Sequence, residues 1–385
     1  MKKILQVFLL VLISTLSLAL TSCDEGNTLY LLNWDEYIDE ELIVEFEKKY
    51  NCSVVLDIAQ SNETMFSKIV SDSAPYDIAF PSDYMIGQML ECDDVEVDAP
   101  ILKPIDFTKL KNYSESIFDE KLMAMINKDC PELKKYCVPY FWGSLGIMYN
   151  TKNLSEEQVS IIEEKGWDVL FEPNLLGNVK IGMYASARDS IAAGLLYNGY
   201  SLNSKDNNEL QKAGDSLFGM NYHAWATDEL KTGVAIGKYD LALVYSGDFF
   251  DTLYSAYDVP EDVEPEIDFN MIAPANNNVF FDAMVIPKNS MNEDLAYKFI
   301  DFMIDQNYTN TDGEVQNNAL LNAQYVGYCP TIASVFNEMI NDPDYEGIAD
   351  LDVYYPGNIT NGEIYKYLGT QTYSVYDSIY KKVKK

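Results

Sequence analysis

The sequence has few of the side chains that most metal and nucleic-acid sites need. It contains one histidine, His223, and one arginine, Arg188. A lone histidine without clustered cysteines predicts no metal site, and no P-loop or GxGxxG motif is present. A site for an amino acid would want a buried arginine for the ligand's carboxylate, so that solute is a poor candidate. With 27 basic and 61 acidic residues, the net charge of −34 argues against nucleic acid and favours cationic partners.

Cysteine is also scarce. Five cysteines follow Cys23, an odd number without CxxC spacing, so neither a zinc site nor a dense disulfide framework is indicated. Cys130 and Cys137 are close enough in sequence to bridge a loop in an oxidising compartment. A disulfide between these two is therefore an expectation that a structure can test.

The N-terminus predicts export. Two lysines precede an apolar run over residues 4–20, which is too short and wrongly flanked for a stable membrane span. Cys23 directly follows Leu-Thr-Ser and resembles the lipidated cysteine of a bacterial lipobox; the alternative is a plain secretory signal. We expect a signal peptide over 1–22, a lipidated tether over 23–27, and a folded chain from residue 28 that a lipid on Cys23 holds at the outer face of the cytoplasmic membrane.

Strand and helix patterns alternate along the remaining chain. Apolar runs predict strands at 28–34, 53–58 and 76–80, with amphipathic helices beginning at Asp39 and Asn62. After an irregular stretch, with a break around 140–143, strands are expected at 179–184, 241–245, 269–273 and 279–286. Helices are expected at 188–197, 228–238, 292–304, 313–326 and 369–382. This spacing predicts an α/β protein with two lobes and parallel βαβ units, whose strand ends face a shared cleft.

An aromatic and an acid or hydroxyl recur where four of these strands end. The four segments are Asn33–Tyr37, Pro81–Tyr84, Tyr245–Asp248 and Phe280–Asp282. Carboxylates neutralise an alkylammonium group, while aromatic faces attract the cation and cover its methylene chain. With 29 tyrosines, each cluster alone can arise by chance, so the recurrence carries the argument. Asp282 is the most informative member, because a buried acid needs a partner.

Gly214-Asp215-Ser216-Leu217 spells the nucleophile block of one esterase family. Here the serine lies inside a predicted helix in mid-chain, and His223 is only seven residues away. A catalytic serine needs a positioned base, and none fits this spacing. We therefore interpret both Ser216 and His223 as structural.

The chain resembles the spermidine/putrescine-binding proteins of bacterial polyamine ABC transporters from about Leu29 to the C-terminal helix. The blocks that carry the resemblance occur in order: Asn33–Tyr37, Ser61–Met65, Pro81–Ser82, Val138–Gly143, Ala187–Asp189, Phe281–Asp282, Gly327–Tyr328 and Asn361–Glu363. The resemblance implies a two-lobed, periplasmic-binding-protein-like (type II) α/β fold whose lobes are joined by crossing hinge strands. It implies lobe 1 at 28–143 plus 281–336 and lobe 2 at 144–280 plus 337–385.

The resemblance also implies a set of ligand contacts. In the first lobe these are Trp34, Asp35, Tyr37, Ser82 and Tyr84, and in the remainder Ser186, Asp189, Tyr245, Asp248, Phe280, Asp282, Tyr328 and Tyr365. Asp35 stands where the family usually has Thr or Ser, Ser186 where some spermidine binders have Asp, and Tyr365 at a Gln position. Asp248 and Ser186 favour a shorter diamine, whereas Asp35 favours a longer amine.

The function implied is capture of putrescine or spermidine for the permease of an ABC importer, by a monomer without catalysis or cofactor. Two alternatives stay open from the residues alone. One is a binding protein for another small cationic solute. The other is an exported hydrolase that uses a carboxylate pair in the same cleft.

Overall fold

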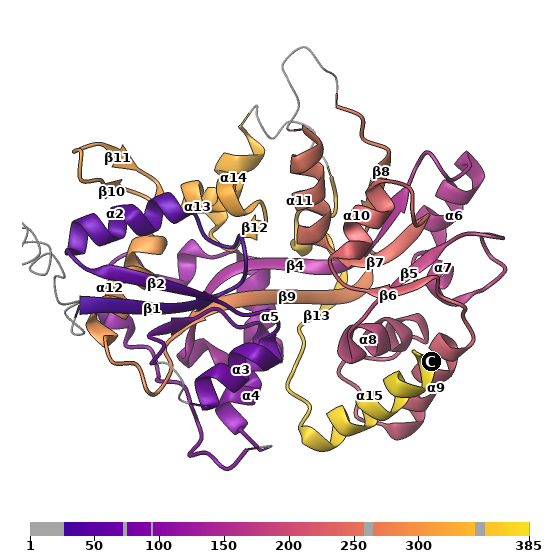
Figure 1. Cartoon of the computed structure of the whole chain (residues 1–385), viewed down its shortest axis with the longest axis horizontal. Helices are drawn as coiled ribbons and strands as arrows, with labels where there is room; N and C mark the ends of the chain where they lie inside the picture. Colours follow the sequence, from indigo (N-terminus) through magenta and orange to yellow (C-terminus); the bar gives the residue numbers. More distant parts are fainter. Residues whose placement is uncertain (1–26, 72–74, 94, 258–264, 343–350, 385) are drawn as a thin grey trace, which may run out of the picture.

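A computed structural model describes residues 27–71, 75–93, 95–257, 265–342 and 351–384. Most of their strands form one large mixed sheet in the order β2-β1-β3-β9-β4-β7-β5-β6, with β8 and β12 also paired to β4 and β13 to β9 (Figure 1). The strands of this sheet are β1 (Thr28–Asn33), β2 (Ser53–Ile58), β3 (Ile78–Ala79), β4 (Cys137–Asn150), β5 (Ile181–Tyr184), β6 (Ala224–Ala226), β7 (Leu241–Tyr245), β8 (Phe269–Ile272), β9 (Asn276–Val285), β12 (Cys329–Pro330) and β13 (Asn361–Glu363). A separate two-stranded sheet consists of β10 (Tyr308–Thr309) and β11 (Val315–Gln316).

Strands β4 and β9 run between the two halves of the molecule (Figure 1). They pair antiparallel from Cys137 opposite Val285 to Ser144 opposite Val279. Beyond that point β4 pairs with β7 and β8 instead. The expected division around 140–143 falls inside β4, which is continuous through it. The strand lacks the alternation of a half-exposed strand since all 14 of its residues are buried.

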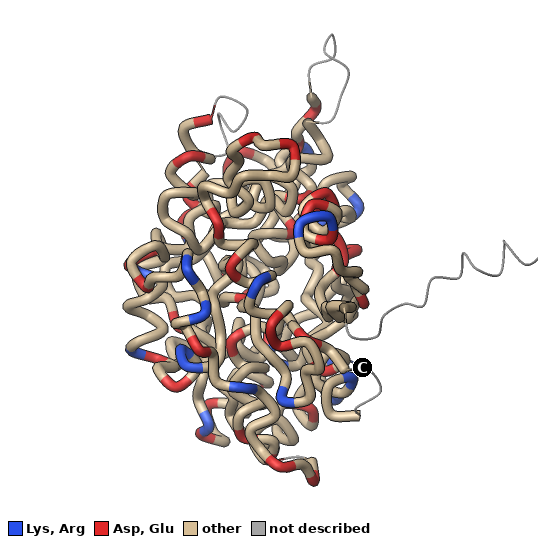
Figure 2. Tube along the Cα trace, turned by 90° about the vertical axis from the view of Figure 1, so that its left-hand side faces the viewer, with Lys and Arg blue, Asp and Glu red and all other residues tan. Residues whose placement is uncertain are grey.

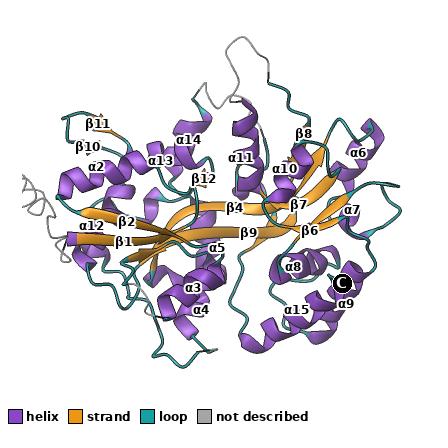
Figure 3. Cartoon of the chain, in the orientation of Figure 1, coloured by secondary structure: helices purple, strands orange, loops and turns teal. Residues whose placement is uncertain are grey.

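In the first half, β2, β1 and β3 are parallel, and β3 joins β9 antiparallel. The predicted βαβ units are confirmed there, and helices lie on both faces of the strands (Figure 3). The helices of this half are α2 (Glu40–Tyr50), α3 (Asn62–Val70), α4 (Asp83–Glu91), α5 (Glu120–Asp129), α12 (Glu293–Met303), α13 (Asn318–Val326) and α14 (Ala333–Ile340). Asp39 and Ser61 cap α2 and α3 with their side-chain oxygens.

In the second half, β6, β5 and β7 are parallel, and β7 joins β4 antiparallel. Its helices are α6 (Glu156–Lys165), α7 (Asp168–Phe171), α8 (Ala187–Tyr197), α9 (Asn207–Phe218), α10 (Glu229–Ala235), α11 (Ser246–Tyr257) and α15 (Thr370–Val383). Ser216 lies within α9, as expected. Acidic residues are spread over the trace (Figure 2).

Three expectations about local structure are wrong. The helix expected at 313–326 begins only at Asn318, because Gly313 has a positive φ in the turn between β10 (Tyr308–Thr309) and β11 (Val315–Gln316), and Asn317 caps α13. Helices α4, α5, α6, α7, α11 and α14 were not expected. The Cys130–Cys137 disulfide is absent: both are buried thiols, and burial raises the pKa of Cys137 to about 12.

The described residues contain no helix that is both long and apolar enough to cross a membrane. The predicted signal peptide and Cys23 lie outside the described residues, as do residues 24–26 of the tether.

One buried carboxylate ties the start of β3 to its surroundings. The two oxygens of Asp77 accept hydrogen bonds from the Tyr30 amide (3.0 Å), the Ser290 hydroxyl (2.8 Å), and the Met291 (2.9 Å) and Asn292 (2.7 Å) amides. Asp77 thereby joins β1 to the segment that begins α12. The strand that it precedes leads directly into Ser82, which lies at the site described below.

We expect Asp77→Ala to lower the free energy of unfolding by about 3 kcal/mol or more, because four donors lose a charged acceptor. Asp98→Ala is the matched control, since the Asp98 side chain is 97% exposed; it should change stability by less than about 0.5 kcal/mol. Urea unfolding measures both. Equal effects of the two substitutions would contradict this role of Asp77.

Candidate ligand-binding site

Asp282, on β9, lies at the centre of the predicted site and is 6% exposed. Ser82 Oγ donates a hydrogen bond to Oδ1 at 2.6 Å, and Tyr37 Oη donates to Oδ2 at 2.7 Å. Ser82 is itself positioned by Asn62, which donates to its hydroxyl and accepts from its amide, both at 3.0 Å. The fold therefore brings together three residues that are 200 and 245 positions apart in the chain.

Burial raises the pKa of Asp282 to about 6, and the hydrogen bonds from Ser82 and Tyr37 only partly oppose that rise. Among the described residues, no lysine or arginine forms an ion pair with Asp282. Its two hydrogen-bond partners are neutral hydroxyls. A buried carboxylate in this situation is costly unless a cation reaches it.

Aromatic rings extend from Asp282 toward the second half of the molecule. The Tyr37 ring packs edge-on against Tyr328 (centroids 5.3 Å apart), and Tyr245 packs edge-on against Phe280 (5.2 Å). Tyr184 joins them at 5.3 Å from Tyr245. Sequence reasoning missed Tyr184, although its place at the end of β5 was an available signal. These rings provide faces for a cation or an alkyl chain.

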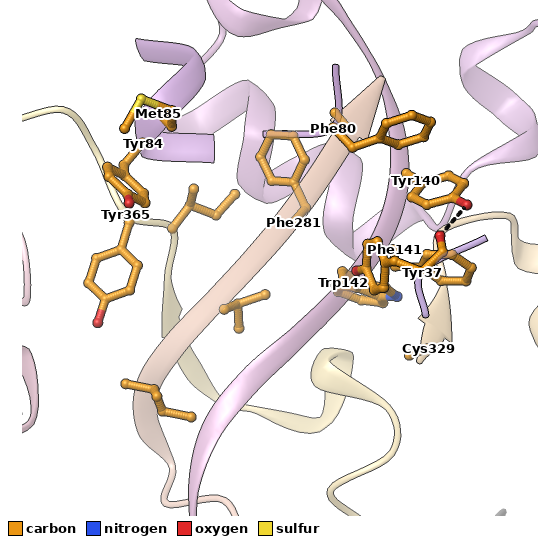
Figure 4. Close-up of a cluster of buried hydrophobic side chains, with 14 of the residues drawn as sticks. Tyr37, Phe80, Tyr84, Met85, Tyr140, Phe141, Trp142, Phe281, Cys329 and Tyr365 are labelled. Atoms are coloured by element: carbon orange, nitrogen blue, oxygen red, sulfur yellow. Dashed lines mark hydrogen bonds between the residues drawn. The ribbon is translucent and has the colours of Figure 1, made fainter. Parts of the chain in front are cut away.

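Tyr37 is held by its own backbone as well as by its ring. Its carbonyl accepts hydrogen bonds from Tyr140 Oη (2.8 Å) and Asn33 Nδ2 (3.2 Å). Figure 4 shows Tyr37, Tyr140 and Phe141 gathered together, with Tyr84 and Tyr365 close to each other some way off. The site is thus anchored on the hydrophobic core around β4 and β9.

Asp189 is also buried, but it already has an internal cation. Its Oδ1 accepts hydrogen bonds from Tyr245 Oη (2.8 Å) and Tyr365 Oη (3.0 Å), and Arg188 Nε lies 3.4 Å away. The Arg188 guanidinium lies over the ring of Tyr84, with its carbon 3.5 Å from the centroid. This stacking connects α8 of the second half to α4 of the first.

Asp248 lies in the first turn of α11, in the second half of the molecule. Burial raises its pKa to about 6, although Lys231 on α10, with its Nζ 3.4 Å from Oδ1, opposes the rise. The preceding Gly247 lies directly against the Tyr328 ring, where a Cβ would come within about 2 Å of three ring carbons. Asp248 and Asp282 both lie near Tyr328, and burial together with these two carboxylates raises the pKa of its hydroxyl.

The remaining predicted residues are less central. Trp34 is half-buried and donates from its indole nitrogen to the Phe80 carbonyl at 2.7 Å, whereas Asp35 is exposed. The Ser186 hydroxyl caps α8 by accepting from the Asp189 amide. Tyr84 donates to Glu63 at 3.0 Å. The described residues contain no group of histidines, cysteines and acids that could hold a metal ion.

The model of the bacterial extracellular solute-binding protein family matches residues 31–308. The chain belongs to this family. The spermidine/putrescine-binding periplasmic protein of Escherichia coli is 26% identical over 375 residues, covering 96% of this chain and 95% of that protein. The predicted family resemblance and periplasmic-binding-protein-like fold are therefore confirmed, and membership of an extracellular family indicates that the mature chain is exported.

Solved structures agree with this assignment. A putative spermidine/putrescine ABC transporter protein from Listeria monocytogenes superimposes with a TM-score of 0.72 at 33% identity, covering 93% of this chain and 99% of that chain. A lipoprotein of Treponema pallidum gives 0.68 at 25% identity, again covering 93% and 99%. The family consists of proteins that bind solutes for transport, which matches a site built from carboxylates and rings.

The raised pKa of Asp282 predicts how stability depends on pH. Its pKa is about 6 in the folded protein and about 3.9 unfolded. The folded state therefore holds the proton more tightly than the unfolded state. Proton binding adds to the free energy of unfolding fully below pH 4, and this contribution is lost as pH rises through 6. As pH rises from 5 to 7.5, the stability of ligand-free Asp282→Asn relative to the wild type should therefore increase by roughly 1 kcal/mol. Urea unfolding at both pH values measures this, and a pH-independent difference would contradict it.

Proposed function

We propose that this protein binds a linear polyamine, putrescine or spermidine, and delivers it to the permease of an ABC importer. The observation that carries the proposal is Asp282, a buried carboxylate with two neutral donors and aromatic neighbours. An alkylammonium group supplies the missing positive charge. The Escherichia coli relative is named for spermidine and putrescine. A relative from Pseudomonas aeruginosa is named for putrescine and cadaverine, and it is 26% identical over 352 residues.

In this proposal one ammonium group of the ligand pairs with Asp282. Tyr37, Tyr328 and Phe280 cover the adjoining methylene chain, and the second ammonium reaches Asp248. Asp189 contributes to the shape of the site instead of pairing with the ligand, because Arg188 and two tyrosines already surround it. Asp282 has no ion-pair partner among the described residues, and Asp248 has a long contact with Lys231 (3.4 Å) but none with a tyrosine hydroxyl. Two such carboxylates favour a diamine over a triamine.

We propose that β4 and β9 act as the hinge, with lobe 1 at 28–143 plus 281–336 and lobe 2 at 144–280 plus 337–385. The change of partners along β4 supports this division. The Arg188–Tyr84 stacking then lies between the lobes. A polyamine shifts the protein toward the closed state only by the difference between its affinities for the closed and open forms.

We also propose that a lipid on Cys23 anchors the monomeric protein to the outer face of the cytoplasmic membrane after removal of residues 1–22. The lipobox-like sequence supports this, and a similar chain of Treponema pallidum is a lipoprotein. The proposal includes no catalysis and no cofactor.

Calorimetric titration with putrescine, spermidine, spermine and a neutral sugar tests the function. We expect saturable binding of the polyamines and none of the sugar. Asp282→Asn should weaken polyamine binding tenfold or more, because it removes the charge that pairs with the ligand.

Asp377→Asn is the matched control, since Asp377 is exposed on α15, and it should bind as the wild type does. If the protein fails to bind polyamines but binds another organic cation, the alternative of a binding protein for a different small cationic solute is favoured. Turnover of a substrate that is lost on substitution of Asp282 or Asp248 would favour the hydrolase.

The pKa values of about 6 for Asp282 and Asp248 predict the pH dependence of binding. An ammonium ligand needs ionised carboxylates, so affinity should be constant above about pH 7 and fall as pH drops through 6. At pH 5 each carboxylate should be about nine-tenths protonated, which predicts a loss of about tenfold for each one that contacts the ligand. Titrations at pH 7.5 and 5 measure the loss, which should be smaller in Asp282→Asn. A pH-independent affinity would contradict both contacts.

A further inference from the structure

The second carboxylate of the site already carries a cation that belongs to the protein. Lys231 Nζ lies 2.7 Å from Asp251 Oδ2 and 3.4 Å from Asp248 Oδ1. The side chains of Lys231 and Asp248 are 21% and 14% exposed, so solvent screens their interaction only in part. Asp251 is half-exposed, at 47%.

Lys231 is held more firmly by Asp251 than by Asp248. A separation of 2.7 Å is a good charge-assisted hydrogen bond, whereas 3.4 Å is a long one. Asp248 is therefore only partly neutralised. The acidic residues Asp248 and Asp251 outnumber the single ammonium between them, which leaves room for a second positive charge at this end of the site.

The position of Asp248 brings Lys231 to the ligand. Gly247 lies against the Tyr328 ring, and that ring packs on Tyr37, which donates to Asp282. A molecule that contacts Asp282 and passes the Tyr328 ring therefore meets Asp248 with the lysine ammonium beside it. Two ammonium groups that share one carboxylate repel each other.

We infer that Lys231 determines the selectivity of the site by competing, as a tethered ammonium, with the distal amine of the ligand for Asp248. The inference rests on the proposed function and goes beyond it. Lys231 weakens the binding of ligands with a second ammonium and leaves a ligand with one ammonium at Asp282 unaffected. The site thereby discriminates by charge at its distal end.

The test compares putrescine with butylamine, which has the same four-carbon chain and one ammonium group. Both are titrated calorimetrically into the wild type and Lys231→Met at pH 8, where Asp248 is ionised. We expect Lys231→Met to bind putrescine about tenfold more tightly and butylamine with unchanged affinity. In the double variant Lys231→Met/Asp248→Asn the gain for putrescine should disappear.

Two control variants separate the local effect from changes in net charge and folding. Lys231→Arg keeps the charge and should keep the wild-type ratio of the two affinities. Lys238→Met makes the same charge change at an exposed position just beyond α10, and it should change the affinity for neither ligand. If thermal melting shows that Lys231→Met is unfolded, Lys231→Gln takes its place.

The outcomes distinguish this inference from the function on which it rests. Equal putrescine affinity in the wild type and Lys231→Met, or an equal gain for both ligands, overturns the role of Lys231 alone. Absence of putrescine binding by the wild type and every variant overturns the proposed function as well.

Discussion

The site depends on a carboxylate buried in a strand that crosses between the two halves of the molecule. Asp282 has no freedom to move to water, because at this point β9 is paired with Phe141 of β4 and bridged to Ser82. Hydroxyls from two other segments satisfy part of its hydrogen-bonding capacity but supply no charge. Burial then keeps the pKa near 6, and the unbalanced charge makes an incoming cation favourable.

Three carboxylates of the predicted ligand set differ in the cation available to each. Asp189 has Arg188, the only arginine of the chain, together with two tyrosine hydroxyls. Asp248 shares Lys231 with Asp251. Asp282 has only neutral donors. The three carboxylates therefore differ in how far the protein's own cations neutralise their charge.

The aromatic residues give this set its shape. Tyr328 lies near both Asp282 and Asp248 and can approach α11 only because residue 247 has no side chain. Tyr245 links the rings to Asp189 through its hydroxyl. In each edge-on pair one ring covers a single face of the other, and the uncovered faces suit contact with a cation or an alkyl chain.

The sequence by itself determined the class of fold and predicted the kind of ligand. Apolar periodicity predicted most strands and helices, since each depends on neighbours within a few residues. The recurrence of acids beside aromatics at expected strand ends predicted a cationic ligand, although Phe280–Asp282 lies inside β9, and ordered blocks predicted the family. Tertiary structure alone decided which acids have partners. The groups around Asp282 come from positions 37 and 82, and Lys231 is 17 residues from Asp248 on a different helix. Pairing across such separations depends on how helices pack and strands register, and local sequence patterns do not encode these distances.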